Sequence, residues 1–186
     1  MNYEKVIKKL RTEKGTSLLE LLVAITLFTF MILVATQIFK MVIDGQRNAI
    51  SAQNVQENMR YALEKMSKEI RMAQKSDTDC LPGATNKVFN VTTDGINDTI
   101  YFKNKDGACV SYYLLDSRLG VTAGGVPDFA TPAKIKVSNL RFNAVDDGIG
   151  DVQPYVTMSM DVEAIGLAIH KQKMKLQITV SSRYYE

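Results

Sequence analysis

The first pattern along the chain is an apolar run without any charged residue. It covers residues 21–39, and its most polar side chains are Thr26, Thr29, Thr36 and Gln37. At about 1.5 Å per helical residue, the 19 residues of this run reach roughly 29 Å, close to the thickness of a bilayer's hydrocarbon core. The pattern predicts a helix that crosses a membrane or is sequestered from water in some other way.

An amphipathic pattern follows the apolar run. Between residues 50 and 73, apolar side chains recur every three to five positions, which is typical of one face of a helix. These residues are Ile50, Val55, Met59, Leu63, Met66, Ile70 and Ala73. The other face carries Glu57, Arg60, Glu64, Lys65, Lys68 and Arg71. Because no proline precedes Pro82, one helix is expected from residue 16 to about residue 74, with an apolar half (16–40) and an amphipathic half (41–76).

Past residue 86 the apolar residues alternate with polar ones, the spacing of half-buried strands. Strands are expected at residues 87–92, 99–103, 108–115, 135–142, 152–164 and 171–182. Asp106-Gly107 predicts a hairpin turn, whereas residues 120–131, rich in glycine and small residues, are expected to form a loop. A long helix before antiparallel strands indicates an α+β fold in which the helix lies across one face of the sheet of a head at residues 77–186.

The net charge of +3 comes from the start of the chain. Residues 1–15 hold five basic and two acidic residues, and the rest of the chain holds 18 of each. Residues 77–186 alone hold 11 basic and 13 acidic residues, which argues against nucleic acid as a partner, since binding to phosphates relies on clustered Lys and Arg. Positive charge on one side of an apolar span keeps that side in the cytoplasm, so the head is expected on the other side.

Three interpretations of residues 1–40 compete. A secretory signal peptide has a shorter apolar core and a small-x-small cleavage site, and no such site follows the run before Lys40. A plain signal anchor fits the length and the flanking charge, but it gives no reason for Gly15 or Glu20. A carboxylate at the edge of an apolar span is costly unless it is paired or lies at the interface. Glu20 is therefore either a functional residue or an acid placed at the lipid headgroups.

The junction before the apolar run resembles that of a known family. From Gly15 the chain reads GTSLLELLVA, which is similar to the class III leader junction of type IV pilins and pseudopilins. In that family a prepilin peptidase cuts after the glycine on the cytoplasmic side, and the new N-terminal residue is usually N-methylated. The resemblance implies cleavage between Gly15 and Thr16, methylation of Thr16, and Glu20 as the fifth mature residue. Thr16 departs from the Phe or Met that is commoner in the family, which bears on methylation more than on cleavage.

A looser resemblance covers the amphipathic half of the helix. Residues 60–73 read RYALEKMSKEIRMA, which is similar to the helix end of PilW-like minor pilins and of J-type minor pseudopilins of type II secretion. Many major pilins have a proline inside the membrane segment, and this chain has none there. The resemblance therefore implies a minor pilin or pseudopilin rather than a major pilin.

The family's assembly chemistry carries over to Glu20. Cleavage exposes a positively charged amine on Thr16, and burying that amine in a filament is costly unless a carboxylate neutralises it. The resemblance implies that Glu20 of one subunit pairs with the Thr16 amine of another. It also implies four partners: prepilin peptidase, other pilin or pseudopilin subunits, an inner-membrane assembly platform, and the lipid bilayer before assembly. The expected location is the inner membrane, with an extracytoplasmic head, followed by a periplasmic or cell-surface filament.

The remaining candidate sites lie in the head. Cys80 and Cys109 are the only cysteines, and an oxidising compartment favours a disulfide between them over two separate buried thiols. Asp146, Asp147 and Asp151 form either an ordinary turn or a calcium loop like those of some pseudopilin heads; the turn is favoured because the EF-hand spacing is absent. No cofactor is expected.

Enzymatic activity has no support in the sequence. His170 is the only histidine, and no nucleophile, base or paired zinc ligand is placed beside it by spacing. Two alternatives to a filament subunit stay open. One is a signal-anchored extracytoplasmic binding domain, and the other is a DNA-uptake receptor pilin that uses Lys171, Lys173 and Lys175, although a solvated strand edge explains these lysines more simply.

Overall fold

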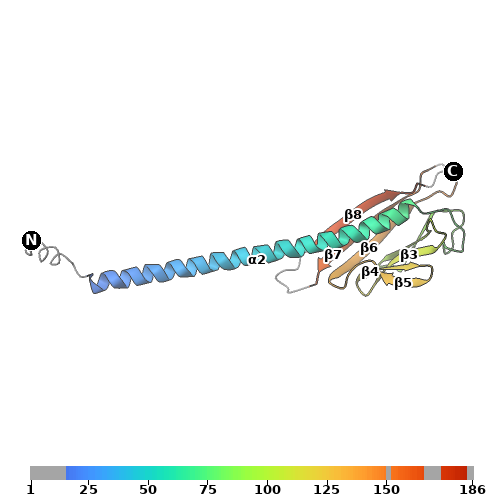
Figure 1. The fold of residues 1–186 in the computed structure, drawn as a ribbon. Coiled ribbons are helices and arrows are strands. Elements are labelled where there is room, and N and C mark those ends of the chain that lie inside the picture. Colours follow the sequence, from blue (N-terminus) through green and yellow to red (C-terminus); the bar gives the residue numbers. More distant parts are fainter. Residues whose placement is uncertain (1–15, 150–151, 166–172, 184–186) are drawn as a thin grey trace, which may run out of the picture. The chain divides into compact units, whose positions relative to one another are not determined.

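The computed structural model describes residues 16–149, 152–165 and 173–183. Its elements are the helix α2 (Leu18–Arg71) and the strands β1 (Phe89–Thr93), β2 (Asp98–Lys103), β3 (Cys109–Leu115), β4 (Arg118–Ala123), β5 (Val126–Phe129), β6 (Ile135–Val145), β7 (Tyr155–Ala164) and β8 (Lys173–Ser181). The chain has the predicted α+β layout, a long helix followed by antiparallel strands (Figure 1). It divides into two compact units between Gly45 and Gln46.

The helix α2 is shorter than the sequence pattern predicts. It ends at Arg71 rather than near residue 74. The cause is competition for backbone hydrogen bonds: the Gln74 amide donates to the Lys103 carbonyl at 2.9 Å, and the Ser76 amide donates to the Lys87 carbonyl at 2.8 Å. These two bridges draw the chain into the strands, so the amphipathic part of the helix stops short of residue 76.

The strands β1 to β5 form a five-stranded antiparallel sheet in which each strand pairs with the next along the chain. β1, β2 and β3 lie within two residues of their predicted bounds. The prediction of a loop at residues 120–131 is wrong, because β4 and β5 occupy most of that segment. Pro127 is tolerated there because β5 is the edge strand of this sheet and pairs only with β4.

Two tight turns account for the two strands that the sequence analysis missed. Asp116 and Ser117 join β3 to β4 with φ angles of 50° and 58°, and Gly124 and Gly125 join β4 to β5 with φ angles of 57° and 85°. Successive residues with positive φ are typical of two-residue hairpins whose twist matches that of the strands. The glycines that suggested a loop therefore form a hairpin.

The strands β6, β7 and β8 form a second antiparallel sheet, in that order. The predicted final hairpin is confirmed, since β7 and β8 pair from Tyr155↔Ser181 to Glu163↔Lys173. β6 is longer than predicted and contains a bulge between Ser138 and Arg141. The head thus has two sheets where a single one was expected.

The core of residues 46–186 lies between the amphipathic part of α2 and the two sheets. Val55, Met59, Met66 and Ile70 are at most 1% exposed, as the helical pattern predicts. Ile50 is an exception at 58% exposed. At 100° per residue, the five positions between Ile50 and Val55 place the two side chains about 140° apart around the helix, so Ile50 faces away from the core.

Polar contacts attach the end of α2 to both sheets. The Tyr112 hydroxyl of β3 donates to Glu69 Oε2 at 2.5 Å, and the Arg183 amide, just past β8, donates to the Arg71 carbonyl at 2.8 Å. Within the core, the ring of Phe102 stacks on that of Tyr112 with centroids 6.2 Å apart. The last turns of α2 and the strands therefore form one packed structure.

Candidate functional site

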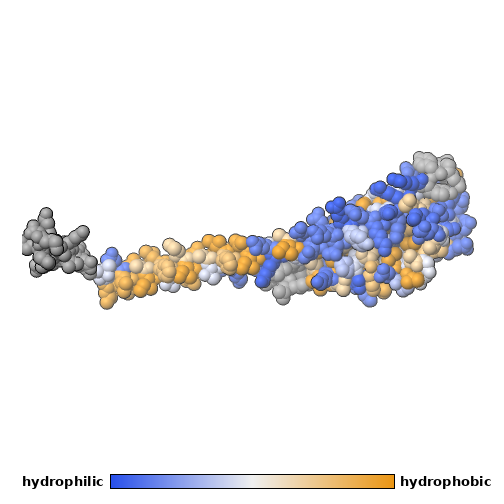
Figure 2. All heavy atoms as spheres, viewed as in Figure 1, coloured by the Kyte–Doolittle hydropathy of each residue, from blue (hydrophilic) through white to orange (hydrophobic). Residues whose placement is uncertain are grey.

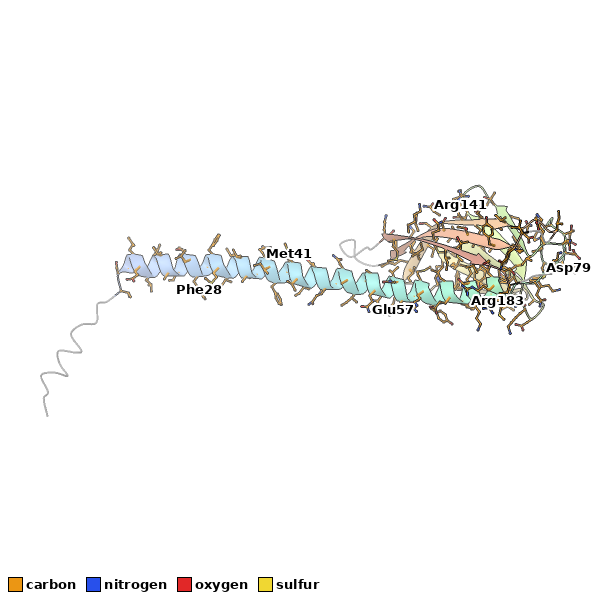
Figure 3. All side chains as sticks on the ribbon, turned by 90° about the horizontal axis from the view of Figure 1, so that it is seen from above. Phe28, Met41, Glu57, Asp79, Arg141 and Arg183 are labelled. Carbon is orange, nitrogen blue, oxygen red and sulfur yellow. A yellow bond between two sulfur atoms is a disulfide. The ribbon has the colours of Figure 1, made fainter. Side chains whose placement is uncertain are left out.

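The apolar part of α2, residues 18–45, contains no buried residue in the described part of the chain. Phe28, Phe30 and Met41 are 64%, 68% and 76% exposed, and the other large apolar side chains up to Val42 are at least 44% exposed. Phe28 and Met41 project outward from the helix (Figure 3), and this segment is almost uniformly hydrophobic (Figure 2). By length and composition the helix can cross a membrane. So large an apolar surface requires a partner, either lipid or other apolar helices.

The hydroxyl groups of this segment are satisfied within the helix. Thr26, Thr29 and Thr36 each donate to a backbone carbonyl three or four residues earlier, at 2.8 Å. Hydroxyls bonded in this way need no partner from water. The segment is therefore compatible with an apolar environment on all sides in spite of its threonines.

Glu20 lies in the first turn of α2. The Leu21 amide donates to the Ser17 carbonyl at 3.1 Å, which makes Ser17 the N-cap and Glu20 the third helical residue. This is the spacing of a capping box, S-x-x-E, and a negative charge here is also favoured by the helix dipole. Capping of the helix is therefore a second explanation for Glu20 beside pairing with an amine, and the S-x-x-E spacing that indicates it is present in the sequence.

Of the two residues at the predicted cleavage site, the structure describes only Thr16. Thr16 is exposed and precedes the first helical turn, whereas Gly15 lies outside the described residues. If the bond to Gly15 is cut, the new amine of this exposed residue, two positions before the helix, is sterically open to modification.

The predicted disulfide is present. Cys80, in the loop after α2, is bonded to Cys109, the first residue of β3. The bond attaches the loop before β1 to the five-stranded sheet.

The acidic turn has a structural role in the described residues. Asp146 accepts hydrogen bonds from the amides of Val88, Phe89 and Gly148, and Asp147 accepts from those of Ile149 and Val152. Both carboxylates are thus occupied by backbone donors. Asp151 lies outside the described residues, and the described residues contain no cluster of metal-ligating side chains.

Two of the three lysines considered for DNA binding, Lys173 and Lys175, lie opposite acidic residues. Lys173 Nζ lies 3.7 Å from Glu163 Oε2, and Lys175 is the register partner of Asp161. Neighbouring carboxylates offset the positive charge of this strand face. His170 and Lys171 lie outside the described residues.

One feature of the head was not predicted, a groove between α2 and β8. It is lined by side chains from the amphipathic part of the helix, by Met174, Leu176 and Ile178 of β8, and by Arg183. Alternation along residues 173–181 indicated that these three apolar side chains share a face, but only the packing decides that this face is incompletely covered.

Comparison with known proteins assigns no family: no protein-family model matches the chain, and no curated protein or solved structure is significantly similar to it.

Proposed function

We propose that this protein is a structural subunit, a minor pilin or pseudopilin, of a type IV pilus or a type II secretion-like filament. The observation that carries the proposal is the apolar part of α2, which is exposed along its length and has a single acid, Glu20, in its first turn. The leader-like junction at Gly15-Thr16 precedes that turn directly.

The proposal explains why an apolar helix carries a carboxylate at its start. After cleavage, the Thr16 amine is positively charged and enters an apolar filament core. An unpaired buried charge costs several kcal/mol, and Glu20 of a neighbouring subunit offsets that cost. The pairing also sets how far one subunit is displaced along the filament relative to the next.

The same helix serves two environments in turn. Before assembly its apolar surface faces lipid, and after extraction it faces the helices of other subunits. The satisfied threonine hydroxyls fit both environments. The partners in this proposal are prepilin peptidase, an inner-membrane platform and other filament subunits, with the head on the outer side of the membrane.

The direct test is intact mass and N-terminal sequencing of the protein purified from the membranes of its own cells. The expected product begins at Thr16 and carries an added methyl group. A product that still contains residues 1–15, in cells whose peptidase cleaves other prepilins, would overturn the proposal.

A second candidate function is a signal-anchored extracytoplasmic binding domain that never polymerises. The capping-box spacing of Ser17 and Glu20 in the first turn favours it, because a cap explains the acid without a second subunit. This candidate expects an uncleaved chain that remains monomeric in the membrane when Glu20 is substituted.

A further inference from the structure

The strand β8 extends its sheet beyond the part that α2 covers. On β7, the side chains of Met158, Met160 and Val162 are each 1% exposed. Their register partners on β8 are Ile178, Leu176 and Met174. These three residues pack against the core but are only partly buried. The apolar face of β8 is therefore partly exposed to solvent.

This open surface forms one wall of the groove. Met59 and Leu63 of α2 line the opposite wall together with Met72, the residue after the helix, and the volume of the groove is about 680 Å³. Volumes of about 300–1,000 Å³ are typical of sites for small molecules. The methionines among the lining residues suit a flexible apolar ligand, since their unbranched side chains adapt to irregular shapes.

The uncompensated positive charge of the groove lies at one end. Arg60 and Glu64 neutralise each other at 2.8 Å. The remaining cations of the lining are Lys68, Arg71 and Arg183. They have no ion-pair partner in the described part of the chain, and all three lie at the C-terminal end of α2, where the Arg183 amide donates to the Arg71 carbonyl. Figure 3 labels Arg183 beside this end of the helix.

A buried hydroxyl without a partner lies at the same end. Ser67 lines the groove one helical turn before Arg71 and is 9% exposed. Within the described residues its Oγ has no hydrogen-bond partner, although Thr26, Thr29 and Thr36 of the same helix all bond to backbone carbonyls. A buried polar atom of this kind costs free energy unless something binds it.

We propose that the groove between α2 and β8 binds a single-chain anionic amphiphile, such as a fatty acid. The anionic group lies at Arg71 and Arg183 and accepts a hydrogen bond from Ser67, and the alkyl chain runs along β8 toward Met174. The strand rises about 13 Å from Met174 to Ile178, which matches an alkyl chain of medium length. This inference does not depend on whether the protein is a filament subunit.

The distribution of charge favours an amphiphile over a protein segment. A protein partner that covers the groove is expected to meet polar side chains on all sides of its apolar centre, as in the polar rims of protein interfaces. Here the charge near the middle of the groove is internally neutralised by Arg60 and Glu64, and the free cations lie at one end only. A single anionic head followed by an apolar tail has that same asymmetry.

The test uses the full chain in phospholipid nanodiscs and a dodecanoic acid that carries a diazirine on its alkyl chain. After illumination, mass spectrometry of peptides locates the label. Labelling of residues 18–45 by probe dissolved in the bilayer is an internal reference. The expected result is strong labelling of the helix peptide that contains Leu63 and of the β8 peptide that contains Leu176, with weaker labelling by the methyl ester of the same probe.

Variants identify the anion contact. The double variant R71Q/R183Q is expected to reduce groove labelling about tenfold relative to the reference, the loss expected for charge-assisted hydrogen bonds. The matched control K136Q/K175Q removes two positive charges from exposed positions on β6 and β8 and is expected to leave labelling unchanged. S67A is expected to reduce labelling without lowering the melting temperature.

Several results would overturn the proposal. These are label confined to residues 18–45, equal labelling by the acid and its methyl ester, and equal effects of the double variant and its control. Crosslinks from the groove to another copy of the chain, without label in the groove, would identify a second subunit as the occupant instead.

Discussion

Tyr112 of β3 donates a hydrogen bond of 2.5 Å to Glu69 in the last turn of α2. The two residues are 43 positions apart in the chain, and the ring of Tyr112 is fully buried beneath the helix. The contact therefore joins the end of the helix to the middle of the five-stranded sheet. Burial and the Glu69 carboxylate raise the pKa of the Tyr112 hydroxyl well above its usual range.

Tyr112→Phe is expected to destabilise the head by about 2 kcal/mol, because a hydrogen bond to a charged, half-buried acceptor is lost. The pH dependence gives a second readout. A phenol whose pKa is raised on folding stabilises the fold fully below its unfolded pKa of about 10 and loses that contribution as the pH rises beyond it. The free energy of unfolding in urea, measured from neutral to strongly alkaline pH, should thus decline above about pH 10, and the decline should be smaller in the variant. An equal decline of the unfolding free energy in the wild type and the variant would contradict this role for Tyr112.

Substitutions of Glu20 separate its two roles. Glu20→Gln keeps the capping-box geometry but removes the charge, whereas Glu20→Ala removes both. If Glu20 neutralises a neighbouring amine, both variants fail to enter filaments or to co-purify with other subunits. If Glu20 only caps the helix, Glu20→Gln behaves like the wild type. Glu57→Gln, at an exposed position of the same helix, is the matched control and should assemble normally.

Removal of the disulfide should weaken the head. The bond closes a loop with a sequence separation of 29, for which loop entropy predicts a stabilisation of about 3–4 kcal/mol. The double variant Cys80→Ser/Cys109→Ser should unfold at a correspondingly lower urea concentration. The wild type treated with a reductant should behave like the variant, and unchanged unfolding in both samples would contradict the prediction.

The Asp146 carboxylate is expected to act as a turn anchor rather than as a metal ligand. Asp146→Ala leaves three backbone amides without their acceptor, and the expected cost is about 2 kcal/mol. Calcium and chelators are expected to leave the melting temperature of the wild type unchanged. A clear rise in melting temperature on addition of calcium would instead support the calcium loop.

Gly45 lies at the boundary between the two compact units, and a Cβ atom at this position would meet nothing within 4 Å. Gly45→Ala should therefore stabilise the helix locally by about 1 kcal/mol, which slower hydrogen exchange around residue 45 would detect. If filament assembly requires the helix to bend at Gly45, the same variant should enter filaments less efficiently, although the stability of its head is unchanged. Normal assembly would show that no bending at Gly45 is needed.

The helix and most strands could be predicted from the sequence because the spacing of apolar residues indicates which face of a helix or strand is buried. The alternation around Val156 and Met158 predicted β7, and the spacing of Val55, Met59 and Met66 predicted the buried face of α2. The hairpin at Gly124-Gly125 was missed because glycine-rich segments suit both loops and tight turns. Strand pairing decides between them: β4 pairs with β3 on one side and with β5 on the other, and glycine content alone does not reveal that pairing.

The sequence by itself determined that residues 21–39 must be kept from water and that one acid stands at their edge, since hydrophobicity and charge are properties of the residues themselves. It also determined the change from helix to strands. Only the tertiary structure decided that Cys80 meets Cys109, that Asp146 holds backbone amides, and that the apolar side chains of β8 remain half-covered beside Ser67 and Arg71. Such contacts depend on how elements that are separate in the chain pack together. The apolar face of a strand is fully buried only where a neighbouring element is wide enough to cover it.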